Sequence, residues 1–299
     1  MRGLSRKFRD ELKSGFVQPV LRLVQGDRTL CLEIREHYIN IYYRGGNILK
    51  ITEKCNAFDT SFDRKYLDEN VTRVPMSLPL KLLAKSDVMA WIDAIPFLKH
   101  EMDLWFGKHP KNEREFQQLM LRENNFKNSA ARGTDYFICD IEYANRKGKF
   151  DLVAVHWPST DRKRNTGLRL AFIEMKYGYK ALKGSAGLAK HIQDIDEFLS
   201  DNEKASNIKA EMINVFNQKL ELELIDCGKS IESLSNHTPE CIIALAEHNP
   251  NSSILKKELD QLPPCTNVEL RFAVSSFMGY GLYDEHIYTL DDFKERFMD

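Results

Sequence analysis

Three short apolar runs between residues 135 and 178 carry acidic residues at positions where a buried strand normally has none. In the last run, LRLAFIEMKYG, Glu174 and Lys176 share one face, because side chains alternate along a strand. The middle run, FDLVAVHW, has Asp151 at its start, and the turn-forming segment PSTDRKRNTG can lay it beside the last run. We therefore expect the carboxylates of Asp151 and Glu174 to meet at one edge of a sheet.

Two converging carboxylates can hold a hard divalent cation through oxygen ligands, with water in the remaining positions. Mg²⁺ fits this description best, and Mn²⁺ can replace it. Such an ion acidifies a bound water molecule and neutralises charge on a phosphate under attack. A nearby lysine can orient that water or stabilise the oxyanions of the transition state. Asp151, Glu174 and Lys176 therefore suffice for the hydrolysis of a phosphodiester.

The spacing of an acid two residues before a lysine is common in this chain. It recurs at four other places, none of which ends an apolar run: Glu11-x-Lys13, Asp63-x-Lys65, Asp161-x-Lys163 and Asp292-x-Lys294. Only Glu174-x-Lys176 follows a run such as LRLAFI and has an aspartate at the start of the preceding run, so the context carries the inference. The alternative is structural: a buried ion pair between Glu174 and Lys176, with Asp151 capping a turn.

Asp151, followed on the next run by Glu174 and Lys176 in the letters EMK, resembles the active-site signature of the PD-(D/E)XK, or restriction-endonuclease-like, nuclease superfamily. The resemblance covers about residues 110–200, and Phe150 stands where the name of the signature has proline. It implies that Asp151 and Glu174 are metal ligands and that Lys176 positions the attacking water. It also implies a core built as a central mixed sheet flanked by helices.

The same resemblance suggests a third metal ligand. In the superfamily the helix before the first strand often adds a glutamate to the site. Glu113, in the leading turn of a helix expected at 111–126, is the best match. Glu115 and Glu123 are rivals that the sequence does not exclude, and a glutamate near a helix N-terminus is also favoured by the helix dipole alone.

Polar residues on two neighbouring elements can support the site. Asp140 and Glu142 share a face by strand parity, so we expect one or both to face the metal; a solvent-facing strand edge is the alternative. His191 and Gln193 lie on a helix expected at 186–199, whose apolar positions define its core face. They either reach the site or lie on the surface.

Positive charge gathers in the same part of the chain. Residues 161–190 hold eight Lys or Arg against two acids. The glycine- and lysine-rich stretch YGYKALKGSAG can follow a phosphate backbone, and an ordinary exposed loop is the alternative. We expect five residues to contact nucleic acid: Arg162, Lys163, Arg164, Lys180 and Lys183.

The composition is that of a globular protein. The chain has 299 residues, 42% of them hydrophobic and 29% charged, and its length permits two domains. A net charge of −1 gives no global basic field, so affinity for nucleic acid must come from local patches. No run approaches the ~18 apolar residues of a membrane span, and the N-terminus lacks the apolar core of a signal peptide, so we expect a cytoplasmic protein. The six cysteines form no CxxC pair, which argues against disulfides and a structural zinc site.

The first part of the chain reads as an α+β domain over residues 1–108. Its pattern predicts an amphipathic helix from residue 3 to about Pro19, a hairpin around the letters RGGN, and a helix over 79–95 that Pro96 ends. The segment FGKHPKN combines glycine, proline and polar residues and is the expected domain boundary.

The second domain, residues 109–299, is expected to be nuclease-like. After the helix at 186–199 the pattern predicts a further helix at 203–224, strands at ECIIALAE and ELRFAVSSFMGYGLY, and a terminal helix at LDDFKERFM. Strands that alternate with helices indicate an α/β class, α+β overall, in which a restriction-endonuclease-like mixed sheet follows a smaller N-terminal domain.

The function predicted from these residues is a Mg²⁺-dependent nuclease or endonuclease that acts on DNA in preference to RNA, with no membrane partner and with a homodimer left open. The alternative is a nuclease fold that has lost catalysis and binds nucleic acid or a protein partner; the intact Asp151, Glu174 and Lys176 argue against it. The letters CGKS at 227–230 resemble the end of a phosphate-binding loop, but Glu223 stands where that loop requires glycine. The chain has no HExxH motif of a metalloprotease.

Overall fold

The computed structural model describes residues 1–67, 77–126, 133–145, 148–184, 187–246, 253–275 and 282–298. The chain forms two compact units, Met1–Gln118 with Gln218–Leu224 and Leu119–Asn217 with Ile225–Asp299. The first unit continues past the expected limit at residues 108 and 109 to Gln118, and the separate segment Gln218–Leu224 also belongs to it. No helix in the described ranges combines the length and the hydropathy that a membrane crossing requires.

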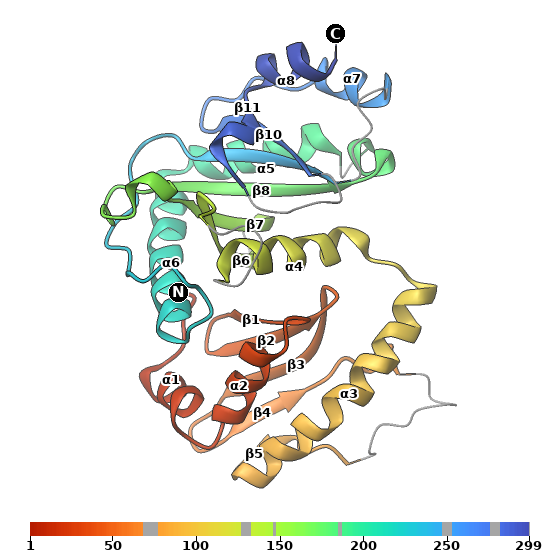
Figure 1. The fold of residues 1–299 in the computed structure, drawn as a ribbon, viewed down its shortest axis with the longest axis vertical. Helices are drawn as coiled ribbons and strands as arrows, with labels where there is room; N and C mark the ends of the chain where they lie inside the picture. The colour runs from red at the N-terminus through yellow and green to blue at the C-terminus, as the bar shows by residue number, and fades with distance from the viewer. Residues whose placement is uncertain are drawn as a thin grey trace. The chain divides into compact units, whose positions relative to one another are not determined.

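The first unit contains a five-stranded antiparallel sheet in which each strand pairs with the next along the chain (Figure 1). Its strands are β1 (Leu30–Ile34), β2 (Tyr38–Tyr43), β3 (Gly46–Glu53), β4 (Phe58–Ser61) and β5 (Lys81–Leu82). The 3₁₀ turn η1 (Arg64–Tyr66) follows β4. The first of the two apolar runs that the sequence separates at RGGN therefore forms two strands, β1 and β2, that pair with each other.

The predicted hairpin is confirmed as the pair β2 and β3. Arg44 and Gly45 connect the strands with φ of 48° and 73°, the left-handed values that a two-residue hairpin turn needs. A Cβ atom at Gly45 would also lie 2.7 Å from the backbone carbonyl carbon of Arg114. Glycine is therefore required at this position both for its φ and for the close approach of another segment.

Two prolines act differently from the sequence prediction. The helix expected up to Pro19 is two helices, α1 (Arg6–Lys13) and α2 (Gln18–Gly26), and Pro19 lies in the first turn of α2, where a missing N–H costs little. Pro96 does not end a helix, because α3 (Lys85–Lys108) continues through it. Side chains on both sides of Pro96, such as Trp91 and Leu98, are buried, and this packing offsets the roughly 3 kcal/mol that an internal proline costs.

The second unit contains a six-stranded mixed sheet in the order β11-β10-β9-β8-β7-β6. The strands are β6 (Tyr136–Asn145), β7 (Gly148–His156), β8 (Arg169–Tyr177), β9 (Glu240–Ala246), β10 (Glu269–Ser275) and β11 (Ile287–Tyr288). Strands β6, β7 and β8 are antiparallel neighbours, β8, β9 and β10 are parallel, and β11 is antiparallel to β10. The expected mixed α/β class is confirmed, and the three apolar runs of the sequence are β6, β7 and β8.

The helices of this part of the chain lie close to their predicted positions. They are α4 (Asn112–Asn125), α5 (Leu188–Ser200), α6 (Asn202–Glu221), α7 (Ser253–Leu259) and α8 (Leu290–Phe297), with 3₁₀ turns η2 (Ser159–Asp161), η3 (Tyr179–Leu182) and η5 (Asp284–His286). Helix α7 and strand β11 were not predicted, since both are too short for their hydrophobic periodicity to be recognised.

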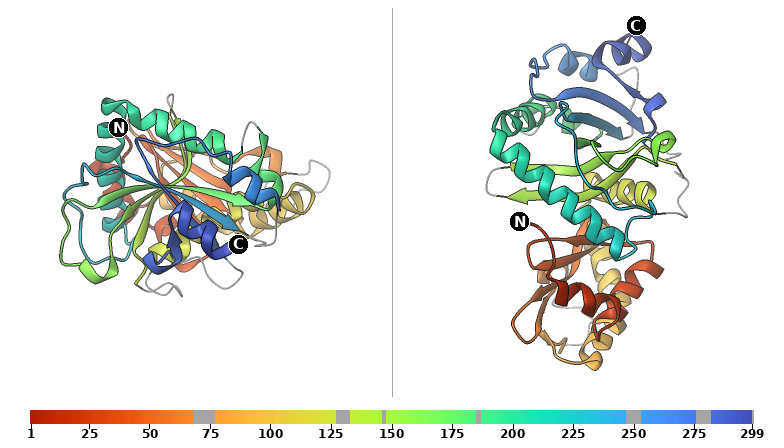
Figure 2. Two further views of the ribbon diagram at one scale, coloured as in Figure 1. Left: turned by 90° about the horizontal axis from the view of Figure 1, so that it is seen from above. Right: turned by 90° about the vertical axis from the view of Figure 1, so that its left-hand side faces the viewer.

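Helices α5 and α6 lie along the same side of the mixed sheet (Figure 2). Phe198 of α5 contacts Phe150 of β7 with ring centroids 5.0 Å apart, and Phe216 of α6 contacts Phe137 of β6 at 5.9 Å. At the outer edge of β6, the amide of Asn125 accepts from the Ile138 N–H and donates to its carbonyl, both at 2.8 Å. A side chain thus covers an edge that would otherwise be open to pairing with another strand.

A buried ion pair ties the returning segment into the first unit. Lys219 Nζ lies 2.7 Å from Glu33 Oε1, and the two side chains are 1% and 0% exposed. Arg35 approaches the same carboxylate at 3.8 Å. Removal of one partner from such a pair leaves a buried charge without compensation, which is costly.

We predict that Lys219→Met lowers the free energy of unfolding by about 3–5 kcal/mol, because the Glu33 carboxylate then loses its closest cation. Chemical denaturation measures this change. The double variant Glu33→Met with Lys219→Met should recover most of the loss. Lys13→Met, which removes an exposed ion pair with Glu221, is the control and should change stability by less than about 1 kcal/mol. A loss of equal size in both lysine variants would contradict the importance of the buried pair.

Candidate active site

Asp151 and Glu174 meet where the ladder between β7 and β8 ends. Paired residues run from His156 and Arg169 to Leu152 and Ile173, one position short of Asp151. Beyond that point side chains replace backbone partners: the Met175 N–H donates to Asp151 Oδ2 at 2.9 Å, and the Asp151 N–H approaches Glu174 Oε1 at 3.4 Å. Each carboxylate is therefore held by the backbone of the neighbouring strand.

Two nitrogen groups face the same oxygen of Glu174. Lys176 Nζ lies 3.8 Å and His191 Nδ1 lies 2.8 Å from Glu174 Oε2. Glu174 and Lys176 are 1% and 3% exposed, whereas the His191 side chain is 28% exposed and reaches the cluster from α5. The structure thus brings together Asp151, Glu174, Lys176 and His191, all four named from the sequence.

The geometry leaves Glu174 Oε2 without a hydrogen bond. Although His191 and Lys176 are near, no donor among the described residues meets this buried oxygen with hydrogen-bond geometry. A buried carboxylate oxygen in this position is costly unless a cation or a proton compensates it. A carboxylate oxygen is the type of ligand that Mg²⁺ prefers, so Glu174 fits the ion that the sequence predicts.

The described residues do not provide a complete set of protein ligands for a metal ion. In the described part of the chain no group of three or more His, Cys, Asp or Glu side chains is placed to hold an ion. The two carboxylates of Asp151 and Glu174 would therefore leave several positions to water, as is usual for Mg²⁺.

Glu142 lies in the same row of the sheet. In the pairing of β6 with β7, Ile141 faces Leu152 and Tyr143 faces Phe150, so Glu142 stands opposite Asp151. It has φ of 51°, an unusual value for a residue with a side chain, and this interrupts the strand alternation that the sequence prediction assumed. Strained backbone of this kind is often found at functional sites. Asp140, by contrast, is fully buried, so the solvent-facing alternative does not hold for it.

Several predicted residues are not in this cluster. Gln193 is exposed and donates to Glu197 Oε1 at 2.8 Å on the surface of α5. Glu113 lies in the first turn of α4 and belongs to the first unit, so its role as a ligand stays a prediction. Lys183 is exposed and follows β8 at the end that carries Glu174, whereas the side chain of Lys180 lies outside the described residues.

The basic loop 162–164 joins β7 to β8 at the end of the strands opposite Asp151 and Glu174. Lys163 and Arg164 are exposed there. Arg162 instead donates to the carbonyls of Trp157 and Thr134, and its Cζ lies 4.5 Å from the Phe137 ring centroid. The Lys and Arg residues counted over 161–190 therefore lie in two separate regions, the loop between β7 and β8 and the segment after β8. The length of the strands keeps these regions apart.

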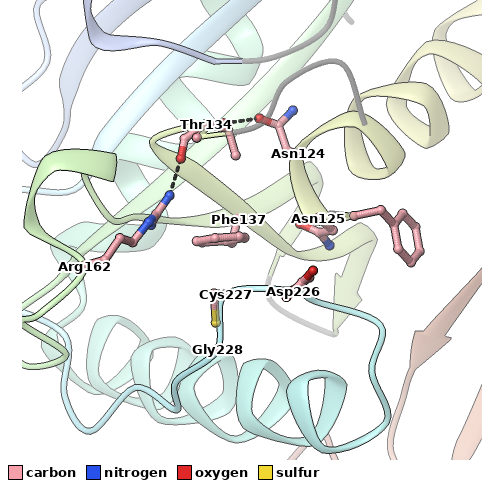
Figure 3. Close-up of a pocket in the computed structure, with 10 residues that line it drawn as sticks. Asn124, Asn125, Thr134, Phe137, Arg162, Asp226, Cys227 and Gly228 are labelled. Carbon is pink, nitrogen blue, oxygen red and sulfur yellow. Dashed lines mark hydrogen bonds between the residues drawn. The ribbon is translucent and has the colours of Figure 1, made fainter. Parts of the chain in front are cut away.

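A pocket of about 530 Å³ lies beside that loop (Figure 3). Its lining comprises Asn124, Asn125, Phe126, Gly133, Thr134, Phe137, Arg162, Asp226, Cys227 and Gly228. Much of its polar lining already serves the fold: Thr134 donates to Asn124 Oδ1, Arg162 donates to the Thr134 carbonyl, and the Asn125 amide is bonded to Ile138. Cys227 is a free thiol whose pKa is raised by burial, so it is not an activated nucleophile. We assign this pocket no ligand.

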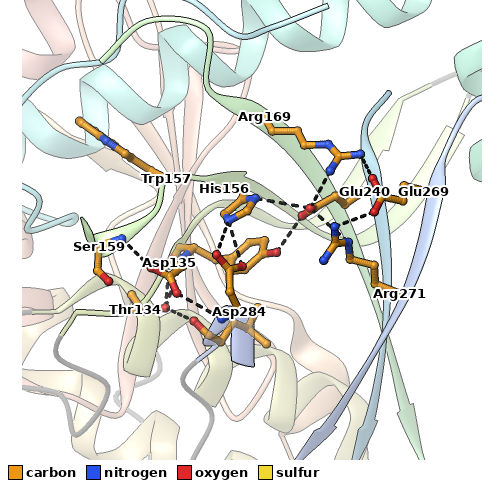
Figure 4. Close-up of polar contacts among 12 residues, drawn as sticks. Thr134, Asp135, His156, Trp157, Ser159, Arg169, Glu240, Glu269, Arg271 and Asp284 are labelled. Atoms are coloured by element: carbon orange, nitrogen blue, oxygen red, sulfur yellow. Dashed lines mark hydrogen bonds and ion pairs between the residues drawn. The ribbon is translucent and has the colours of Figure 1, made fainter. Parts of the chain in front are cut away.

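A second polar cluster, not found from the sequence, lies at the same far end of the sheet (Figure 4). The buried Glu240 accepts from Tyr136 Oη at 2.8 Å and from Arg169 Nη1 at 3.0 Å, and it lies 3.4 Å from His156 Nδ1. His156 Nε2 is 3.1 Å from Asp284 Oδ1. The available signal was a glutamate opening the apolar run ECIIALAE, but its partners are far apart in sequence.

The charges in this second cluster compensate one another. Burial alone would lower the pKa of His156, yet Glu240 and Asp284 outweigh it, so its pKa is raised. Burial would raise the pKa of Glu240, but His156, Tyr136 and Arg271 together hold it below its usual value. The carboxylate of Glu240 is therefore compensated from several strands, and the cluster is explained by stability.

No family model, curated protein or solved structure matches this chain. The candidate site is therefore defined by its own residues and their geometry.

We predict that protonated His156 stabilises the fold. Since its pKa is raised on folding, its contribution is fully present below the unfolded pKa of about 6.5 and is lost as the pH rises through the folded value. The melting-temperature difference between the wild type and His156→Gln should therefore shrink from about pH 6 to about pH 9. The exposed His237, changed to Gln, is the control. A difference that stays constant over this range would show that His156 acts by packing alone.

Proposed function

We propose that this protein is a metal-dependent nuclease whose active site is formed by Asp151, Glu174 and Lys176. The observation that carries the proposal is the buried Glu174 Oε2, which faces Lys176 and His191 and receives no hydrogen bond from the described residues. Asp151 lies beside it, held by the Met175 N–H.

The contact between Glu174 and Lys176 is a poor structural ion pair. Its atoms are 3.8 Å apart, and the two side chains are almost fully buried. Desolvation of two charges is repaid only by close contact and good hydrogen bonds. The buried pair of Glu33 and Lys219, at 2.7 Å, meets that requirement, and this one does not. A role in chemistry explains why the charges of Glu174 and Lys176 are placed here.

Each residue has a distinct task in the proposal. Asp151 and Glu174 hold the divalent ion, Mg²⁺ or Mn²⁺ in its place, through carboxylate oxygens. When bound, the ion supplies activation of water and neutralisation of phosphate charge. Lys176 extends from the same strand face as Glu174, where its ammonium can orient the attacking water or stabilise a phosphate oxygen.

The surroundings support a nucleic-acid substrate. The central mixed sheet with helices packed on it is the kind of core that the PD-(D/E)XK resemblance implies. Lys183 follows the strand of Glu174 and is exposed, so it can contact a phosphate backbone near the site. We propose DNA in preference to RNA as the substrate.

Purified protein should nick or cut DNA with Mg²⁺ or Mn²⁺ and should be inactive in excess EDTA, because the three side chains cannot acidify water without the ion. Asp151→Asn and Lys176→Met should each lower the cleavage rate about 10²-fold or more. Supercoiled plasmid, single-stranded DNA and RNA are the substrates to compare by gel assay.

Asp63→Asn is the matched control, since Asp63 and Lys65 repeat the same spacing in an exposed ion pair. It should cleave as the wild type does. Undiminished cleavage in EDTA would refute the mechanism. Inactivity on all three substrates would favour a nuclease fold that only binds.

Thermal melts of Asp151→Asn test the metal site without catalysis. Asparagine keeps an oxygen to accept from the Met175 N–H but removes a charge beside Glu174, so the metal-free variant should melt slightly above the wild type. Millimolar Mg²⁺ should stabilise the wild type, by about 2.7 kcal/mol at 100 times its Kd, and leave the variant almost unchanged. A variant that melts several degrees lower in EDTA, with a wild type insensitive to Mg²⁺, would make Asp151 structural.

A further inference from the structure

The contact between His191 and Glu174 is close but is not a directed hydrogen bond. Nδ1 and Oε2 are 2.8 Å apart, yet the oxygen receives no hydrogen bond from the described residues. The two atoms are therefore close together without the geometry of a hydrogen bond between them. Two ligands at right angles on one ion, with bonds of about 2.1 Å, are about 3 Å apart. The observed separation is close to that value.

The fold holds the imidazole in this position. Leu188, Ile192 and Ile195 of α5 are fully buried, so the helix that carries His191 is packed firmly on the sheet. The His191 side chain is 28% exposed, so part of the imidazole is in contact with solvent. Among the described residues no group of three or more His, Cys, Asp or Glu side chains is placed to hold an ion, so Asp151, Glu174 and His191 would have to shift to bind one ion together.

We propose that His191 is a ligand of the catalytic metal through Nδ1, next to Glu174 Oε2, and that this nitrogen makes the site select Mn²⁺ or a similar transition-metal ion over Mg²⁺. The inference rests on the proposed nuclease function and specifies its cofactor. Mg²⁺ prefers oxygen ligands, whereas first-row transition-metal ions also take an imidazole nitrogen, Mn²⁺ most weakly among them. A site of carboxylates alone has no comparable preference.

Calorimetric titration of Mn²⁺ and of Mg²⁺ into the wild type, His191→Asn and Gln193→Ala tests the selectivity. His191→Asn should lose Mn²⁺ affinity by at least about ten-fold with a much smaller change for Mg²⁺. Gln193→Ala alters an exposed residue on the same helix and should behave as the wild type. Equal losses for both ions in His191→Asn would overturn the selectivity, since His191 would then only position Glu174.

Pulsed electron paramagnetic resonance of the Mn²⁺-loaded wild type gives a direct readout that needs no variant. Coupling of the ion to an imidazole nitrogen, altered when the histidines carry ¹⁵N, is expected. If Mn²⁺ binds in a Glu174-dependent manner but shows no such coupling, the inference about His191 is wrong while the proposed function stands. If the wild type binds neither Mn²⁺ nor Mg²⁺, both are wrong.

Discussion

The site depends on the point where β7 and β8 cease to pair through their backbones. Asp151 accepts from the Met175 N–H where a carbonyl of the neighbouring strand would otherwise do so, and the Asp151 N–H faces the Glu174 carboxylate. These contacts between side chains and backbone hold both carboxylates in place and involve one oxygen of each. Because the arrangement is set by backbone groups of a central strand, the fold itself holds the side chains in place, as the proposed active site requires.

The two ends of the mixed sheet treat buried charge in different ways. At the far end, Glu240 is surrounded by Tyr136, His156, Arg169 and Arg271, and its pKa is held below the usual value. At the near end, Glu174 Oε2 lies close to two nitrogen groups and accepts no hydrogen bond from the described residues. The first arrangement compensates the carboxylate within the fold, although Arg271 Nε in it likewise makes no hydrogen bond with the described residues. In the second arrangement a buried carboxylate oxygen lacks a hydrogen bond. The proposed metal ion would compensate its charge.

Proline and glycine show why local signals have limited reach. Gly45 was predicted correctly as a turn residue because its requirement for positive φ is local. Pro96 was predicted to end a helix, yet α3 continues through it, because buried contacts on both sides outweigh the local cost. Likewise, the buried pair of Glu33 and Lys219 could not be anticipated, since 186 positions separate its members.

The sequence by itself determined which residues could do the chemistry: alternation along a strand places Glu174 and Lys176 on one face, and the hairpin between the two runs brings Asp151 beside them. These are consequences of local geometry and short separations. Only the tertiary structure decided that His191 faces the same oxygen, that Gln193 does not, and that the basic loop at 162–164 lies at the opposite end of the strands. Helix packing and strand direction set those positions, and both depend on contacts between segments that the local pattern does not encode.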